Sequence, residues 1–224
     1  MSSSSRSPLV VTIDGPAASG KSSTARFVAE RLGVRHVDSG LLYRGIAAAR
    51  LRLADPPDLW TEQSVLEAGA RISLAPGETS FTARLDGAEC EAELRGAAVT
   101  AVVSLVARMP QVRAWVNGLV RGAAASHEVV ADGRDMGTAV FPDARLKVWL
   151  VAMPEERARR RLLQRTGRAP TPAELAAESA ELEARDRKDR EQTQPAADAV
   201  WIDTTDLSQD EQVGRIVALA EERR

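Results

Sequence analysis

The sequence predicts an α/β fold in which a parallel β-sheet is covered by helices on both faces. Apolar, β-branched segments at 9–13, 128–131 and 145–151 alternate with segments of helical composition. Strands that alternate with helices form parallel sheets, because each crossover returns the chain to the same end. Hydrophobic residues make up 44% of the chain and charged residues 28%, so we expect a single domain over 9–224 after a disordered leader at 1–8.

Each expected element rests on its composition and on the residues that bound it. Gly33 ends the first predicted helix, since glycine readily adopts the left-handed conformation that closes helices. Pro56 and Pro57 end the next one. We expect strands at 9–13, 34–37, 128–131, 145–151 and 199–202. We expect helices at 22–32, 41–53, 61–70, 97–107, 111–125, 154–165, 174–190 and 211–222.

Residues 71–95 change to a two-residue period. Apolar and polar side chains alternate through 80–85, which favours a half-buried strand. Asp86-Gly87 then offers a tight hairpin turn, so we expect 89–93 to return as a strand and 71–74 to supply a third. The segment is therefore predicted to be a small antiparallel insertion.

The segment from Gly15 to Ser22 fits the pattern G-x-x-x-x-G-K-[ST] between a predicted strand and a predicted helix. Backbone N–H groups of such a loop surround a phosphate, and the positive end of the helix adds to the attraction. Lys21 suits a catalytic role at the outer phosphates, and the Ser22 hydroxyl suits Mg²⁺. A glycine turn that only caps a helix is the alternative. The predicted nucleotide-binding residues are Gly15, Pro16, Ala17, Ala18, Ser19, Gly20, Lys21, Ser22 and Ser23.

Two further polar segments follow predicted strands, at the same edge of the sheet as the phosphate loop. Residues 38–44 carry Asp, Ser, Tyr and Arg side chains, and residues 132–137 carry two aspartates beside Arg134. A capped helix and a polar turn are the alternatives, since Asp and Ser are good N-caps. Two carboxylates and an arginine leaving one strand end are better explained by a ligand.

The chain resembles the bacterial cytidylate kinases from about Leu9 to its C-terminus. The motifs that carry the resemblance are, in order, 15–22, 38–44, 132–138, 184–189 and 196–199. The segment 132–138, Asp-Gly-Arg-Asp-Met-Gly-Thr, is the most discriminating. The resemblance implies a P-loop NTPase fold with a five-stranded parallel sheet flanked by helices, a mobile lid at about 155–172, and an acceptor-binding region enlarged by the antiparallel insertion. It implies transfer of the γ-phosphoryl group of ATP, with Mg²⁺, to CMP or dCMP.

The resemblance also implies the acceptor site. Its expected residues are Ser39, Tyr43, Arg44, Ser104, Arg113, Asp132, Arg134, Asp135, Arg185 and Asp189. Asp135 would recognise cytosine together with Ser104 and Arg113, because a carboxylate accepts a hydrogen bond from the cytosine amino group. Arg185 and Asp189 would contact the ribose hydroxyls; from the residues alone they would pass as a surface ion pair.

The acceptor phosphate needs little chemical activation. Its second pKa is near 6, so the attacking oxygen is already ionised at pH 7 and transfer needs no general base. The work is positioning and cancelling charge. By resemblance, Arg44 and Arg134 would hold this phosphate, and Arg134 is therefore also a predicted catalytic residue.

One position departs from the family pattern. The family commonly has an arginine three residues after the aspartate that matches Asp189, and this chain has Gln192 there. Arg187 and Arg190 are near, but neither stands at that position. Two alternatives to the cytidylate kinase activity remain open from the sequence: another P-loop kinase, for adenylate, thymidylate or a non-nucleotide alcohol, and a non-catalytic nucleotide-binding regulatory module.

Arginines crowd the segment 157–168, and Arg157, Arg161, Arg165 and Arg168 share one face of a helix. Like charges four residues apart repel each other, so such a face needs an anion. For a kinase this is the lid, with Arg157 and Arg161 as predicted catalytic residues that close on the transferring phosphates. A solvated helix in an arginine-rich chain is the alternative, and acidic flanks without aromatics argue against nucleic-acid binding.

Charge and composition exclude several classes of protein. A net charge of −2 argues against a protein that coats nucleic acid or an anionic membrane. The longest early apolar run is too short for a signal sequence or a membrane span, and the single Cys90 excludes an internal disulfide. We expect a cytoplasmic monomer that binds small nucleotides, with no nucleic-acid or membrane partner, and with structural rather than catalytic roles for His36 and His127.

Overall fold

The computed structural model describes residues 8–190 and 193–224 and contains two sheets. The larger sheet has five parallel strands in the order β2-β6-β1-β7-β8, as expected for this fold class. Its strands are β1 (Val10–Asp14), β2 (Arg35–Asp38), β6 (Val129–Gly133), β7 (Leu146–Val151) and β8 (Val200–Asp203). The leader predicted at 1–8 lies, except for Pro8, outside the described residues. No helix in the described ranges has the length and apolar character to cross a membrane.

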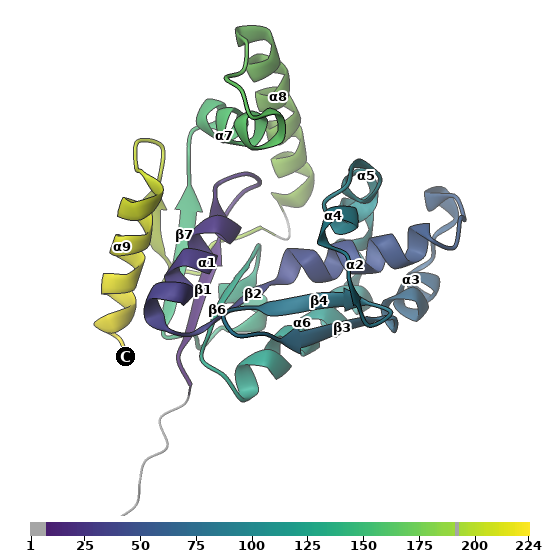
Figure 1. Ribbon diagram of the computed structural model, residues 1–224, viewed down its shortest axis with the longest axis horizontal. Coiled ribbons are helices and arrows are strands. Elements are labelled where there is room, and N and C mark those ends of the chain that lie inside the picture. Colours follow the sequence, from purple (N-terminus) through teal and green to yellow (C-terminus); the bar gives the residue numbers. More distant parts are fainter. Residues whose placement is uncertain (1–7, 191–192) are drawn as a thin grey trace, which may run out of the picture.

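Helices cover both faces of the parallel sheet (Figure 1). Side chains of β6 alternate between the two faces: Val129 and Ala131 join one apolar core, and Val130 joins the other. The core of Val130 is closed by α1 (Lys21–Leu32) and α9 (Gln209–Glu221). The opposite core is closed by α2 (Ser39–Leu51) and α6 (Pro110–Ala125). Every strand of the sheet centre is thus buried on both sides, which explains its continuous apolar character.

A second layer packs against α2, on the right in Figure 1. It comprises α3 (Glu62–Gly69), α5 (Ala97–Val106) and an antiparallel sheet of β3 (Ile72–Pro76), β4 (Phe81–Leu85) and β5 (Ala88–Glu89).

The return strand predicted at 89–93 is wrong beyond Glu89. The hairpin turn forms at Asp86 and Gly87, both with positive φ, but only Ala88 and Glu89 pair with β4. The chain then forms the short helix α4 (Glu91–Leu94). Both β5 residues are exposed, whereas the helix buries Leu94 in the core, so more apolar surface is removed from water by the helical turn.

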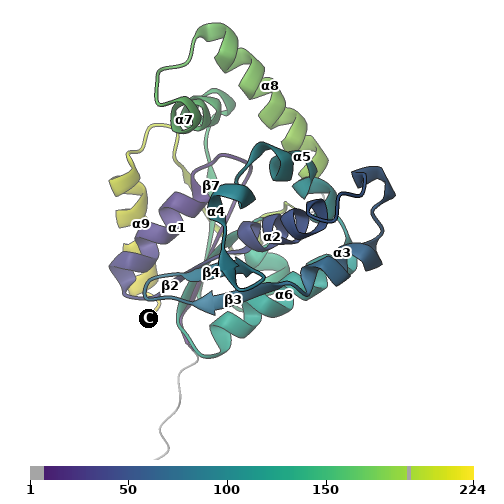
Figure 2. The same cartoon turned by 45° about the vertical axis from the view of Figure 1, so that its right-hand side comes forward.

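Two helices stand apart from the rest of the molecule (Figures 1 and 2). They are α7 (Pro154–Thr166) and α8 (Pro172–Asp189), and they pack against each other. Ala158 and Leu182, one from each helix, pack on Ala17 of the phosphate loop. A capping box between Thr171 and Glu174 begins α8, so this helix starts two residues before the predicted 174.

Two short helical turns were not predicted from the sequence, η1 (Pro57–Leu59) and a π-helical turn, η2 (Met136–Val140). Asp14 at the end of β1 stabilises η2, because its carboxylate accepts hydrogen bonds from the backbone N–H groups of Met136 and Gly137 at 2.9 and 2.8 Å. The partner lies 122 residues away along the chain, so local composition carries no signal for it.

Gly15 joins the phosphate loop to the sheet and tolerates no side chain. Its φ is +154°, and a Cβ there would lie 2.2 Å from the carbonyl oxygen of Leu150 on β7. We predict that Gly15→Ala lowers the free energy of unfolding by about 2 kcal/mol or more. Gly118→Ala, in an open position on α6, should raise it by about 0.5–1 kcal/mol. Urea denaturation of both variants measures this, and equal effects would contradict the clash.

Candidate functional site

A cleft of about 1700 Å³ opens where the phosphate loop, the layer on α2 and the helices α7 and α8 meet. All ten residues predicted for an acceptor site line it: Ser39, Tyr43, Arg44, Ser104, Arg113, Asp132, Arg134, Asp135, Arg185 and Asp189. The predicted residues Ala17, Ala18, Gly20, Lys21, Ser22, Ser23 and Arg161 line it too. Four predicted residues lie off its wall: Gly15, Pro16, Ser19 and Arg157.

Arg157 anchors the phosphate loop instead of facing the cleft. Its buried guanidinium donates hydrogen bonds to the carbonyl oxygen of Ala17 at 2.9 Å and to Asp186 Oδ2 at 2.6 Å. Asp186 Oδ1 in turn accepts from the backbone N–H of Ala17 at 3.1 Å. One ion pair, between the buried Arg157 and the partly exposed Asp186, therefore ties the loop to both α7 and α8, and the charge of Arg157 is already matched by Asp186.

Three carboxylates lie at the carboxyl edge of the sheet: Asp38 ends β2, Asp14 ends β1, and Asp132 is the last residue but one of β6. Burial raises the pKa of Asp14 to about 6 against the hydrogen bonds from Gly137 and Met136. Burial and then the charge of Asp132 raise the pKa of Asp38 to about 6. Asp38 also caps α2 through the N–H of Leu41, so the capped-helix explanation holds for this residue.

Asp132 connects the phosphate loop to β2. Its Oδ2 accepts from the Ser22 hydroxyl at 2.6 Å, and its Oδ1 lies 2.6 Å from His36 Nε2. Burial lowers the pKa of His36, but the hydrogen bond and charge of Asp132, with the charge of Asp38, outweigh it and raise the pKa overall. His36 belongs to this network, which the sequence did not indicate for an isolated histidine.

Lys21 is poised between charge states. Its Nζ donates to the carbonyl oxygen of Pro16 at 2.7 Å. Burial and then the positive charge of Arg134 lower the pKa of Lys21 to about 7, although Asp132 and Asp14 oppose the shift. An anion at this position would restore the charged form.

The part of the cleft beside α5 and α6 holds a matched pair of opposite charges. Arg113 contacts the Asp135 carboxylate and also donates to the carbonyl oxygen of Ala107 at 3.0 Å. Burial raises the pKa of Asp135 against the charge and hydrogen bond of Arg113. Tyr43 lies beside them with its hydroxyl buried and without a hydrogen-bond partner among the described residues, and burial raises its pKa to about 12. Ser104 lines the same pocket.

Positive charge exceeds negative charge along the middle of the cleft. Asp189 is the partner of both Arg134, at 3.4 Å, and Arg185, at 3.7 Å. Burial and then Arg134 lower the pKa of Arg185 to about 10. Arg44 donates to the carbonyl oxygen of Leu94 at 3.0 Å, and burial followed by Arg95 lowers its pKa. Such depressed arginine pKa values mark a site where an anion would be stabilised.

The arginines predicted to share one face of α7 are neutralised mainly by α8. Arg161 and Arg165 both pair with the buried carboxylate of Glu178, at 3.1 and 3.0 Å, and both line the cleft. Arg168 lies beyond the end of α7 and pairs with Glu174. Glu174 and Glu178, part of the acidic segment next to the arginine run, therefore supply the opposite charge.

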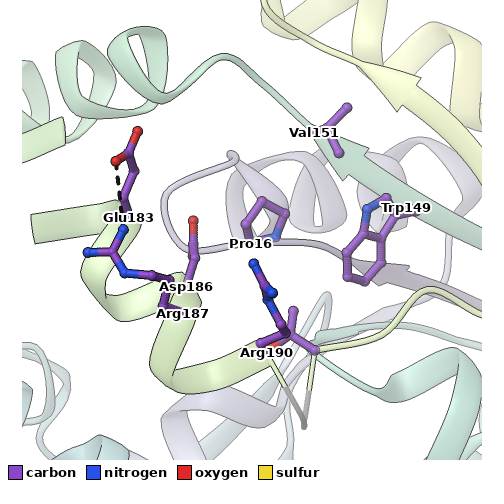
Figure 3. A pocket seen from close by; sticks show the side chains of 8 residues that line it. Pro16, Trp149, Val151, Glu183, Asp186, Arg187 and Arg190 are labelled. Carbon is purple, nitrogen blue, oxygen red and sulfur yellow. Dashed lines mark ion pairs between the residues drawn. The ribbon is translucent and has the colours of Figure 1, made fainter. Parts of the chain in front are cut away.

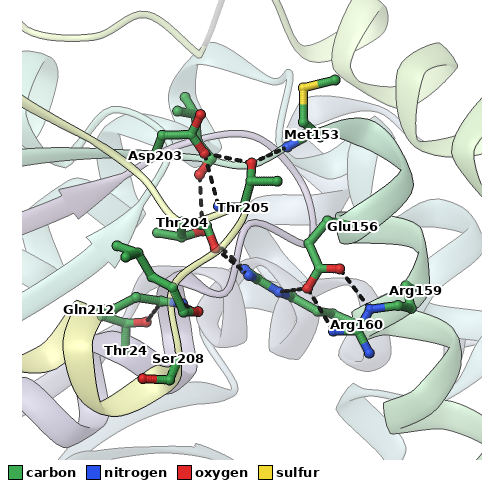
Figure 4. A network of polar contacts seen from close by, with 12 residues as sticks. Thr24, Met153, Glu156, Arg159, Arg160, Asp203, Thr204, Thr205, Ser208 and Gln212 are labelled. Carbon is green, nitrogen blue, oxygen red and sulfur yellow. Dashed lines mark hydrogen bonds and ion pairs between the residues drawn. The ribbon is translucent and has the colours of Figure 1, made fainter.

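Sequence analysis missed the wall of the cleft formed by α7 and the loop after β8 (Figure 4). Arg160 donates to Thr204 Oγ1 at 3.0 Å and to the Thr204 carbonyl oxygen, and Glu156 holds its other edge. Leu207 and Ser208 complete this wall beside Gly20 and Ser23. Only the arginine run at 157–168 hinted at Arg160.

A second cavity of about 420 Å³ lies between Pro16 of the phosphate loop, β7 and α8 (Figure 3). Pro16, Trp149, Arg187 and Arg190 are among its lining residues. Arg187 and Arg190 are the arginines near Gln192, where the family commonly has an arginine, and neither of them lines the cleft. Gln192 itself lies outside the described residues.

Comparison with known proteins places the chain in a family. A family model described as cytidylate kinase matches residues 11–222. A cytidylate kinase of Thermus thermophilus is 44% identical over 210 residues, which covers 93% of this chain and 97% of that protein. One of Deinococcus radiodurans is also 44% identical, over 93% and 98% of the two chains. The crystal structure of an uncharacterized protein from Eubacterium ventriosum matches 96% of this chain with a TM-score of 0.52 at 11% identity, a likeness in fold alone.

Glu178 carries the packing of α7 on α8. We predict that Glu178→Ala lowers the free energy of unfolding by about 1–3 kcal/mol, because it leaves two arginines without their shared buried partner. Glu181→Ala, at an exposed position of the same helix, should change it by less than about 0.5 kcal/mol. Chemical denaturation followed by circular dichroism measures both, and equal losses would contradict the role of Glu178.

Proposed function

This chain belongs to the cytidylate kinase family, and we propose that it transfers the γ-phosphoryl group of ATP to CMP or dCMP. The observation that carries the choice of acceptor is the pairing of Arg113 with the buried Asp135 carboxylate in the part of the cleft beside α5 and α6. Asp135 offers a charged acceptor to the cytosine amino group, and Arg113 offers donors to the neighbouring carbonyl group.

In this proposal the donor occupies the part of the cleft beside the phosphate loop. Phosphate oxygens of ATP accept hydrogen bonds from the loop at 15–23 and the charge of Lys21. The wall formed by Arg160 and Leu207 offers a planar cation and an apolar side chain to the adenine base.

Between the donor and the base of the acceptor, the arginines in the middle of the cleft bind the phosphates. Arg44 and Arg134 hold the phosphate of the acceptor, while Arg185 and Asp189 contact its ribose. Arg161 and Arg165 lie on the facing wall and stabilise the charge that spreads over the oxygens of the transferred group. Since the attacking oxygen is already ionised, these residues align the reactants and exclude water, and none acts as a general base.

The residues beside the phosphate loop fit Mg²⁺. The described residues contain no cluster of three or more His, Cys, Asp or Glu side chains able to hold a metal. Mg²⁺ takes few protein ligands, keeps water and phosphate oxygens, and prefers hard oxygen donors such as the Ser22 hydroxyl. Ser22 would hold the ion, and Asp132 would fix the direction of that hydroxyl. When bound there, Mg²⁺ would neutralise part of the charge of the phosphates.

Several finer points remain predictions. We propose that the protein acts as a monomer in the cytoplasm and needs no nucleic acid. Another acceptor is the leading alternative within the fold. A non-catalytic regulatory module is disfavoured, because a second anion site beside the first serves no purpose in a nucleotide sensor.

A panel of acceptors tests the function, together with a variant of the base pocket. With ATP and Mg²⁺, we predict ADP release with CMP and dCMP at rates above those with AMP and dTMP. Asp135→Ala should lower kcat/KM for CMP about 10- to 100-fold, the effect of a lost charged hydrogen bond, and leave ATP affinity within about twofold. Asp143→Ala, at an exposed site, is the control. Turnover with a different acceptor alone, or equal losses for CMP and ATP, would overturn the proposal.

We predict that the protein takes up a proton at Lys21 when ATP binds. With its pKa near 7, Lys21 is mostly neutral at pH 8 in the free protein, and the phosphates favour its charged form, which raises the pKa. Asp14 and Asp38, with pKa values near 6, are already ionised at pH 8. Calorimetry in buffers of different ionisation enthalpy should therefore show uptake of nearly one proton. Lys21→Met should abolish it, and uptake unchanged in that variant would contradict the assignment.

A further inference from the structure

His36 is buried against the network that supports the phosphate loop. Its Nε2 lies 2.6 Å from Asp132 Oδ1, and the side chains of His36 and Asp132 are only 9% and 3% exposed. The other oxygen of the same carboxylate accepts from Ser22 Oγ at 2.6 Å. A continuous chain of two short hydrogen bonds thus runs from β2 through β6 to the first turn of α1.

The geometry explains why Asp132 needs a partner on β2. Asp38 stands opposite Asp132 in the register of the two parallel strands, so two carboxylates face each other across adjacent strand ends. His36 precedes Asp38 by two residues and projects from the same face of β2. It therefore reaches the side of Asp132 that is close to Asp38, where a polar donor offsets the repulsion between the two acids.

We propose that His36 is a positioning residue for phosphoryl transfer. It holds Asp132 so that Oδ2 accepts the hydrogen bond from the Ser22 hydroxyl. The lone pairs of Ser22 Oγ are then directed away from Asp132 and are available to Mg²⁺. Without the donor at Oδ1, the carboxylate can rotate about its Cβ–Cγ bond and release Ser22. This inference rests on the proposed role of Ser22 toward the metal.

The chain offers variants that separate hydrogen bonding from packing. His36→Gln keeps an N–H donor at nearly the distance of Nε2, whereas His36→Asn is polar but too short to reach Asp132. His36→Leu fills the space without a donor. The backbone N–H of His36 donates to the Thr79 carbonyl oxygen at 3.0 Å, a contact that all three variants retain.

The test compares kinetics with metal binding. We expect kcat to fall about 10-fold in His36→Leu and His36→Asn, with KM for CMP within about twofold, and to recover to within about threefold in His36→Gln. Electron paramagnetic resonance of Mn²⁺ with a non-hydrolysable ATP analogue should show metal affinity weakened by a similar factor in Leu and Asn only. Wild-type kcat in His36→Leu, or equal losses in Gln and Asn with unchanged Mn²⁺ affinity, would overturn the proposal.

Two reference variants separate this inference from the proposed function. Ser22→Ala and Asp132→Asn should each weaken Mn²⁺ binding and lower kcat more than His36→Leu does. If both keep wild-type metal binding, the proposed role of Ser22 is wrong. If both lose it while all three His36 variants behave as wild type, only the positioning role of His36 fails. Should His36→Leu melt at a lower temperature, the comparison of Gln with Asn still decides.

Discussion

The structure depends on how it places charges at the carboxyl edge of its parallel sheet. Asp14, Asp38 and Asp132 lie at the carboxyl ends of three neighbouring strands, and Lys21 stands above them. Burial raises the pKa values of Asp14 and Asp38 and lowers that of Lys21, so each of these groups is shifted toward its neutral form. Phosphates supply nearby negative charge, which favours the protonated form of Lys21. Binding of the nucleotide thus offsets the cost of holding a charged Lys21 in a buried position.

The placement of charges also determines how α7 and α8 are attached to the phosphate loop. These helices contact the phosphate loop through the small cluster of Ala17, Ala158 and Leu182 and through the Arg157–Asp186 pair. A small apolar contact with one partly buried ion pair fixes direction more than it adds stability. The hydrogen bond from Ala17 N–H to Asp186 places a residue of α8 directly on the loop, so the packing of this helix and the shape of the phosphate loop depend on each other.

The parallel sheet predicted from the sequence is confirmed, and most residues predicted for the site lie around one cleft, because the signals of both are local. Strands buried on both faces read as apolar runs, and Gly15–Ser22 has a fixed spacing. It failed where a distant partner decides. The return strand ended at Glu89 because Leu94 reaches the core, η2 forms on Asp14, and Arg157 turned away from the cleft toward Asp186. Asp14 and Asp186 are far away in sequence, and the core that receives Leu94 is built from other elements of the chain.

The chain has only three lysines, Lys21, Lys147 and Lys188, and this scarcity has a physical reason at the cleft. Three times, one acid serves two arginines that line it: Asp189 serves Arg134 and Arg185, Glu178 serves Arg161 and Arg165, and Glu156 serves Arg159 and Arg160. An arginine fork can bond a carboxylate on one edge and still offer N–H donors on the other, which an ammonium group does less directionally. Each shared acid therefore orients two cations while leaving a net positive charge toward the cleft. Lysine remains where a compact charge must fit inside a loop, at position 21.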